Sequence, residues 1–294
     1  MKSNKINRKK LTDHAIAFFT IFIWGITFVC TKHLENKFSA LEILFFRYLT
    51  AYIVLWILCP HPFRFAGAKR ELYIFAAAMS GAALYQYLEN LSVLYTSPAS
   101  VSFITAAAPL FTAILASIYL SEKFTRKNLI GMIISLGGVF LICFGDSKTI
   151  DTGLKGDLII FASIWLWAVY SIIVKKISNF GYPQFMITRR LFLYSLLVML
   201  PFMIFKHTPT NFSALADTQV IIYLAFLGIF ASAICFATWN RSVQNLGATI
   251  TSKYLFVMPI ITLAAQSIAY KGEIGAAALL GMAVTLGGIA VSEF

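Results

Sequence analysis

The chain has 294 residues, of which 59% are hydrophobic and 12% are charged, and its mean hydropathy is +0.79. A soluble domain carries about 25% charged residues, so this composition excludes a water-soluble globular domain. The formal net charge of +12 does not indicate a nucleic-acid partner, because the basic residues lie between apolar runs, where they orient segments in a membrane.

Ten apolar segments are each long enough to cross the roughly 30 Å hydrocarbon layer as a helix of about 20 residues. In chain order they are residues 12–31, 40–59, 71–93, 97–120, 127–144, 156–175, 183–205, 218–240, 247–269 and 275–292. Residues 1–11 form a basic tail that we expect to be cytoplasmic, and no convincing cleavage site follows it. The sequence therefore predicts an all-α integral membrane protein with ten transmembrane helices.

The two halves of the chain carry the same landmarks. After 143 residues Trp24, Lys32, Asn36 and Arg47 recur as Trp167, Lys175, Asn179 and Arg190. After 150 residues Asn90, Ser102, Pro109 and Gly137-Gly138 recur as Asn240, Ser252, Pro259 and Gly287-Gly288. We therefore expect a first five-helix repeat over residues 12–144, a linker over 145–155 and a second five-helix repeat over 156–294.

An odd number of helices in each repeat forces the second repeat to enter the membrane from the opposite face. The repeats are then inverted about an axis in the membrane plane, an arrangement that gives transporters two related conformations. With the N-terminus inside, 14 Lys and Arg residues lie on the cytoplasmic side and 6 outside, which fits the positive-inside rule. We expect a multi-pass protein of the cell (plasma) membrane with both termini cytoplasmic.

Short motifs follow one another along nearly the whole chain. They are Trp24-Gly25-Ile26-Thr27-Phe28 with Lys32, Phe46-Arg47-Tyr48, Glu89-Asn90-Leu91-Ser92, Tyr95-Thr96-Ser97-Pro98-Ala99-Ser100, Pro109-Leu110-Phe111, Leu120-Ser121-Glu122-Lys123 and Gly131 with Gly137-Gly138. In these motifs the chain resembles the drug/metabolite transporter superfamily, in its EamA-like branch, although Ser121 stands where that family often has glycine. The resemblance implies two inverted five-helix lobes, a central cavity and export or exchange of small metabolites, and it names no substrate.

We expect the cavity to be lined by spans 1, 3, 4, 6, 8 and 9. Pro109 and Pro259 lie about 12 residues into spans 4 and 9, near the midplane. A proline there frees a backbone carbonyl that must face protein or water, so both prolines are expected beside the substrate path or at a hinge, with a simple packing kink as the alternative.

Aromatic and amide side chains complete the expected cavity. Trp24, Trp167 and Tyr170 lie away from the membrane interfaces, where they would bind flat or apolar substrates by stacking, or else serve ordinary helix packing. The repeated Asn90 and Asn240 belong to the same candidate set.

Charged residues inside the spans fall at two depths. Arg47 and Glu89 share a level near the outer surface, and because isolated charges are costly there, we expect them to approach each other directly or through water. An alternative role for Glu89 is proton coupling. Arg189, Arg190 and Lys253 share the inner level with no acidic residue at that depth in the second half, which suggests attraction of an anionic substrate group, or else contact with the cytoplasmic surface and anionic lipid.

These features predict a secondary transporter for small metabolites or drug-like amphiphiles, amino acids included, that works in export by alternating access. One alternative is an organic-anion or phosphate-ester exchanger using Lys253 with Arg190, and a weaker one is a membrane-embedded lipid enzyme. No P-loop, H-E-x-x-H or G-x-S-x-G motif occurs, so we expect neither ATP hydrolysis nor other enzyme chemistry. We expect no cofactor, no metal site and no nucleic acid; the expected partners are a small-molecule substrate and membrane lipid, and no oligomeric state is indicated.

Overall fold

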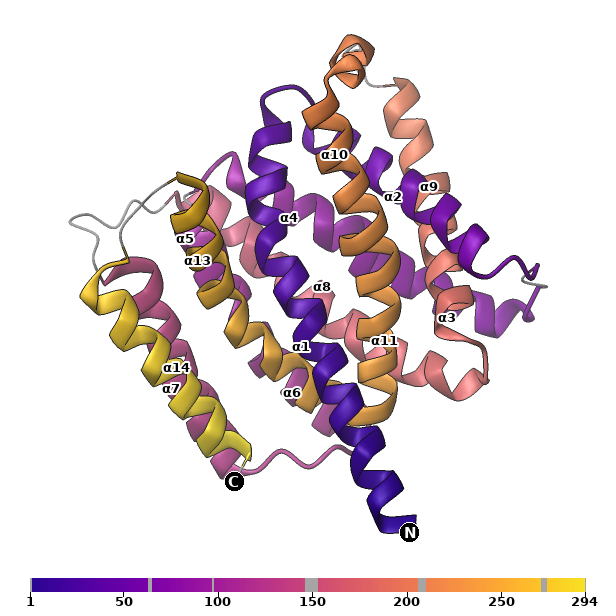
Figure 1. The fold of residues 1–294 in the computed structure, drawn as a ribbon. Helices are drawn as coiled ribbons and strands as arrows, with labels where there is room; N and C mark the ends of the chain where they lie inside the picture. Colours follow the sequence, from indigo (N-terminus) through magenta and orange to yellow (C-terminus); the bar gives the residue numbers. More distant parts are fainter. Residues whose placement is uncertain are drawn as a thin grey trace.

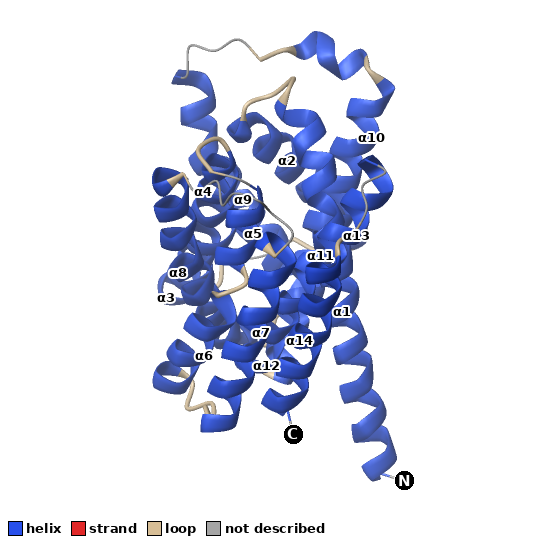
Figure 2. Cartoon of the chain, turned by 90° about the vertical axis from the view of Figure 1, so that its left-hand side faces the viewer, coloured by secondary structure: helices blue, strands red, loops and turns tan. Residues whose placement is uncertain are grey.

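The computed structural model describes residues 2–62, 65–96, 98–145, 153–205, 210–270 and 274–293. Within these ranges the regular structure is helical, and no strand occurs. The helices pack as one elongated bundle with both chain termini at the same end (Figures 1 and 2). We call this the inner end and the opposite one the outer end. Residues 146–152, most of the expected linker, lie outside the described residues.

The helices follow the expected order of spans. The first half contains α1 (Lys2–Glu35), α2 (Ala40–Leu58), α3 (Ala68–Ala77), π-helix η1 (Ala78–Leu84), α4 (Tyr85–Val93), α5 (Pro98–Thr105), α6 (Ala108–Tyr119) and α7 (Arg126–Phe144). The second half contains α8 (Leu154–Ile177), η2 (Ser178–Phe180), α9 (Gln184–Phe205), η3 (Phe212–Ala216), α10 (Thr218–Phe226), π-helix η4 (Leu227–Ile234), α11 (Cys235–Leu246), α12 (Ala248–Lys253), η5 (Tyr254–Val257), α13 (Met258–Tyr270) and α14 (Ala276–Glu293).

Eight helical segments of the described chain are long and apolar enough to cross a membrane, and Ala276–Ser292 is a shorter apolar helix. The remaining predicted span, the third, forms one continuous rod from α3 through η1 to α4. The all-α membrane fold predicted from the sequence is therefore confirmed.

The first helices of the two halves, α1 and α8, run in opposite directions. Near the start of α1, the Asp13 carboxylate accepts a hydrogen bond of 2.9 Å from Asn245. The carbonyl of the neighbouring Gln244 accepts one of 2.6 Å from Lys175, in the last turn of α8. Helix α8 therefore ends where α1 begins, as inverted repeats require.

Helices α7 and α14 cross as a close pair at one edge of the bundle (Figure 1). Ser135 Oγ donates to the carbonyl of Thr285 (3.1 Å), and Thr285 Oγ1 donates to the carbonyl of Ser135 (3.4 Å). These residues are separated by the 150-residue repeat interval, so the contact is reciprocal, as expected about a two-fold axis. Gly138 and Gly281 allow the close approach, since a Cβ on Gly138 would lie 2.6 Å from the Gly281 carbonyl oxygen.

Spans 4 and 9 are each interrupted near their middle. Helix α5 ends at Thr105 and α6 begins at Ala108, which places Pro109 in the first turn of α6. In span 9 the 3₁₀ segment η5 precedes α13, whose second residue is Pro259. A proline in the first turn of a helix removes no helical hydrogen bond, so both prolines start new helices rather than kink continuous ones.

Spans 3 and 8 each contain a π-helix, η1 and η4. The separation of these two π-helices along the chain is close to the 150-residue repeat interval. Carbonyls in both accept hydrogen bonds from neighbouring helices: Tyr48 Oη donates to Ala82 (2.5 Å) and Trp24 Nε1 donates to Ala231 (2.8 Å). The π-helices thus anchor α1 and α2, and such segments are frequent at functional sites.

Ser121, the departure from the family motif, has a left-handed backbone with φ of 55°. This conformation costs a residue with a Cβ about 1–2 kcal/mol, and glycine's greater freedom in the unfolded chain offsets roughly half of that. We expect Ser121→Gly to stabilise the protein by about 0.5–1 kcal/mol, measured by thermal unfolding in detergent. The control Ser117→Gly, inside α6, should destabilise it; an unchanged or lower midpoint for Ser121→Gly contradicts the prediction.

Candidate functional site

A cavity lies between the two halves and reaches toward the outer end, where Lys32 and Glu35 in the last turns of α1 line it. Its other lining residues are Trp24, Thr27, Thr31, Arg47, Tyr85, Gln86, Glu89, Asn90, Val101, Trp167, Leu255, Met258 and Gln266. Spans 1, 3, 4, 6 and 9 contribute as the sequence predicted, and span 2 adds Arg47. Span 8, also expected there, lies behind Trp24.

Arg47 and Glu89 face this cavity from α2 and α4, and both are at least 90% buried. Arg47 Nε donates to Ser232 Oγ at 2.8 Å. The Glu89 carboxylate accepts hydrogen bonds from Tyr85 Oη (2.8 Å) and Gln86 Nε2 (3.1 Å). Among the described residues no ion pair within 4 Å joins Arg47 to Glu89, so the two charges share the cavity without direct contact.

Aromatic rings form one wall of the cavity. The rings of Trp24 and Trp167 meet edge to face with centroids 5.6 Å apart, and Tyr85 lies 4.9 Å from Trp167. All three side chains line the cavity. The wall therefore presents a largely apolar aromatic surface to the cavity.

Tyr170 and Asn240 lie together but outside the cavity lining. Tyr170 Oη donates to Asn240 Oδ1 (2.7 Å), and Asn240 Nδ2 donates to Thr188 Oγ1 (3.2 Å), with all three side chains fully buried. These bonds stay within the protein, which gives the pair a packing role. Pro109 and Pro259 are also buried and do not line the cavity.

The inner arginines do not line the cavity, and for Arg190 the expectation of no acidic neighbour is not met. Arg190 Nη2 lies 3.0 Å from Glu71 Oε1, because α3 of the first half packs against α9. The Arg189 guanidinium stacks 3.9 Å over the Trp56 ring and donates to the carbonyl of Cys59. The expectation considered only acidic residues of the second half, and Glu71 lies in the first half.

Lys253, the third residue of the expected inner cluster, is also separate from the cavity. Its side chain is 4% exposed, and Nζ donates to the carbonyl of Ser292 at 3.0 Å. It lines a polar pocket at the inner end together with Glu122 and Lys175.

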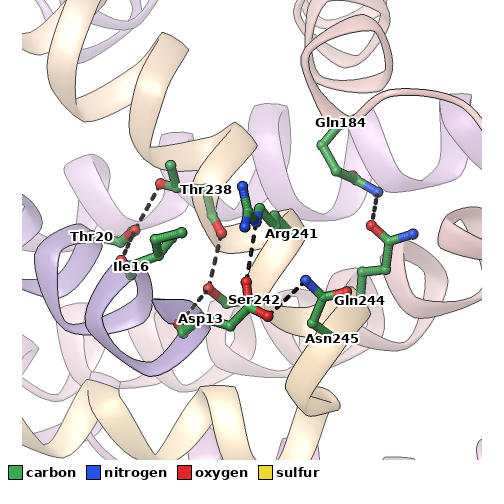
Figure 3. Close-up of polar contacts among 9 residues, drawn as sticks. All are labelled: Asp13, Ile16, Thr20, Gln184, Thr238, Arg241, Ser242, Gln244 and Asn245. Carbon is green, nitrogen blue, oxygen red and sulfur yellow. Dashed lines mark hydrogen bonds and ion pairs between the residues drawn. The ribbon is translucent and has the colours of Figure 1, made fainter. Parts of the chain in front are cut away.

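A polar network at the inner end joins α1 to α11 (Figure 3). The buried Asp13 carboxylate accepts hydrogen bonds from Arg241 Nε (3.1 Å) and Asn245 Nδ2 (2.9 Å). Nearby, the hydroxyls of Thr20 and Thr238 lie 2.8 Å apart. Sequence reasoning missed Asp13 because it stands beside the basic tail, although a single acid in the first turn of a span was a usable signal.

Glu122 makes a second contact between the halves at the inner end. Its carboxylate accepts hydrogen bonds of 2.9 Å from the backbone N–H groups of Ala248 and Thr249, at the start of α12. A carboxylate there satisfies free N–H groups of the helix terminus. Contacts between the halves thus hold the inner end together, while the cavity reaches the outer end, where Lys37 pairs with Asp217 across the halves.

A model of the EamA-like transporter family matches residues 14–144 and, a second time, residues 154–294. The chain belongs to the EamA-like transporter family. Each of the two matches to the family model covers one half of the bundle. The repeat in the family model therefore coincides with the inverted halves of this EamA-like protein. The resemblance seen in the sequence motifs is confirmed, and the family supports a multi-pass membrane transporter.

Similar proteins are transporters too. The uncharacterized transporter YyaM of Bacillus subtilis (strain 168) is 32% identical over 58% of this EamA-like chain and 56% of its own length. The chain thus matches little more than half of that relative. A probable amino-acid metabolite efflux pump of Salmonella typhimurium is 20% identical over 96% of this chain and 95% of its own. A solved crystal structure matches with a TM-score of 0.77 at 17% identity, covering 96% of this chain and 98% of that one, which shows the fold alone.

Proposed function

We propose that this EamA-like protein exports small zwitterionic metabolites, amino acids above all, by alternating access. The observation that carries the proposal is the pair Arg47 and Glu89, which are buried in one cavity and not paired with each other. An ammonium group beside Glu89 and a carboxylate beside Arg47 would neutralise both charges at once. Because unpaired charges are costly in a membrane, a zwitterion fits this cavity better than an uncharged amphiphile or an ion of one sign.

The aromatic wall and the relatives support the same substrate class. Trp24, Trp167 and Tyr85 offer an apolar surface for a side chain, while the name of the Salmonella relative refers to an amino-acid metabolite. Export then requires rocking of the halves that opens the inner contacts of Asp13 and Glu122. An organic-anion exchanger based on Arg190 and Lys253 is less well supported, because protein groups bind both side chains outside the cavity.

Counterflow in proteoliposomes tests this function. We expect exchange of a neutral amino acid such as leucine, and at least about tenfold slower exchange of its decarboxylated amine and of its deaminated acid, since each analogue leaves one buried charge unpaired. Accumulation against a gradient would distinguish a transporter from a channel. Equal exchange of all three compounds, or exchange of the amine or the acid alone, would contradict the proposal.

Proton coupling at Glu89 is a second candidate role. The hydrogen-bond partners of Glu89 are the neutral side chains of Tyr85 and Gln86 rather than a cation, which leaves the carboxylate able to exchange a proton. Transport by the Glu89→Gln variant should then no longer respond to a pH gradient, whereas Glu35→Gln at the cavity mouth should keep the wild-type response. Unchanged gradient dependence in Glu89→Gln removes this role.

A further inference from the structure

Two buried N–H donors in the cavity wall have no hydrogen-bond partner among the described residues. Asn90 Nδ2 and Trp167 Nε1 make no hydrogen bond within the described chain, although the two side chains are only 8% and 3% exposed. Both residues line the cavity. Leaving a buried donor unpaired is costly, and such groups normally have an acceptor when the protein performs its function.

The internal repeat provides a comparison for each donor. Trp24 occupies the position of Trp167 in the first half, and its Nε1 donates to the Ala231 carbonyl (2.8 Å). Asn240 occupies the position of Asn90 in the second half, and its Nδ2 donates to Thr188. In each pair one copy, Trp24 or Asn240, is satisfied inside the protein, while the other, Trp167 or Asn90, lines the cavity with its donor unsatisfied; Trp24 lines the cavity as well. The unsatisfied donors of Trp167 and Asn90 are therefore not explained by burial alone, because their buried counterparts have partners.

The surroundings of the donors determine what they can bind. Asn90 follows Glu89 directly in α4, and Trp167 packs on Tyr85, whose hydroxyl donates to the Glu89 carboxylate. The lining of one cavity thus contains two neutral donors, one buried anion and Arg47. Neutral N–H groups cannot bind an ammonium, whereas a carboxylate offers several lone pairs to such donors.

The geometry points to a carboxylate subsite formed by Trp167 Nε1 and Asn90 Nδ2, next to an ammonium subsite at Glu89. This inference rests on the proposed function and adds residues that select the substrate. An α-amino acid, whose two charged groups share one carbon atom, would occupy both subsites at once. The side chain of the substrate then lies against the aromatic wall.

Trp167→Phe and Asn90→Leu test the subsite, because each removes a donor and keeps much of the shape. The readout is the ratio of counterflow rates for leucine and for its decarboxylated amine, 3-methylbutylamine. We expect each variant to lower this ratio by about 10- to 100-fold, the usual loss for a hydrogen bond to a charged group. The amine lacks the carboxylate, so its own exchange should change little, which also shows that the variant is folded.

Trp239→Phe is the matched control. Trp239 Nε1 is also buried without a partner in the described chain, and its ring lies 5.6 Å from that of Trp167, but it does not line the cavity. The control should keep the wild-type ratio. Wild-type ratios in both Trp167→Phe and Asn90→Leu would overturn the subsite and leave the proposed function standing. A wild-type protein that exchanges no amino acid would overturn both.

Discussion

Replacement of Arg47 by glutamine is expected to lower leucine counterflow by about 30-fold to more than 1,000-fold. The guanidinium is buried in the cavity, and removing one partner of a buried charged contact costs roughly 2–5 kcal/mol of binding. The substrate carboxylate would lose its cation, and Glu89 would lose the balancing charge that shares its cavity. Initial rates in proteoliposomes, normalised to the amount of folded protein, provide the measurement.

Two further variants separate substrate binding from folding. Lys32→Gln removes an exposed cation at the cavity mouth and should cost less than about fivefold, because solvated charges contribute little. The double variant Arg47→Gln/Glu89→Gln restores the charge balance, so it should elute as a single species like the wild type and still fail to exchange leucine. Transport by Arg47→Gln within threefold of wild type would remove Arg47 from the site.

Among the substitutions proposed for this protein, Gly138→Ala is expected to cause the largest loss of stability. The loss should lie at the upper end of the roughly 1–3 kcal/mol typical of overpacking. A Cβ at Gly138 would lie 2.5 Å from the backbone nitrogen of Thr285 and 2.6 Å from the Gly281 carbonyl oxygen. Backbone atoms cannot turn aside as a side chain can, so α7 and α14 would have to separate. The unfolding midpoint in detergent and the yield of monodisperse protein would both fall.

The neighbouring Gly137 provides the control for this prediction. It lies in the same helix, and a Cβ there would meet no atom within 4 Å. Gly137→Ala should therefore keep or raise stability, by up to about 1 kcal/mol, because alanine has the higher helix propensity. Equal effects of the two substitutions would show that the α7–α14 contact does not depend on close approach of the backbones.

Sequence patterns were sufficient for the overall plan of the protein. Apolar length defines the spans, and repeated landmarks such as Trp24 with Trp167 define the two halves. The number of residues between each charge and the end of its predicted span placed Arg47 and Glu89 at the same depth in the membrane. In the structure both line one cavity. These inferences succeed because membrane thickness fixes helix length and an odd repeat fixes inversion.

The details that the sequence did not reveal depend on contacts between helices. Arg190 meets Glu71 only because α3 and α9 are neighbours, which no single-helix pattern encodes. Asn90 and Asn240 look equivalent in the sequence, yet Asn90 lines the cavity whereas Asn240 accepts a hydrogen bond from Tyr170. The breaks before Pro109 and Pro259 also lie in uninterrupted apolar runs, so hydropathy gave no sign of them.

We infer that two inverted halves enclose one cavity that is reached in turn from opposite sides of the membrane. Side-specific labelling of single cysteines at Lys32 and Lys175, which are equivalent in the two repeats, tests it most directly in a background without the four native cysteines. We expect an impermeant maleimide to label Lys32→Cys only from outside and Lys175→Cys only from the cytoplasmic side. Labelling of both positions from the same side would contradict it.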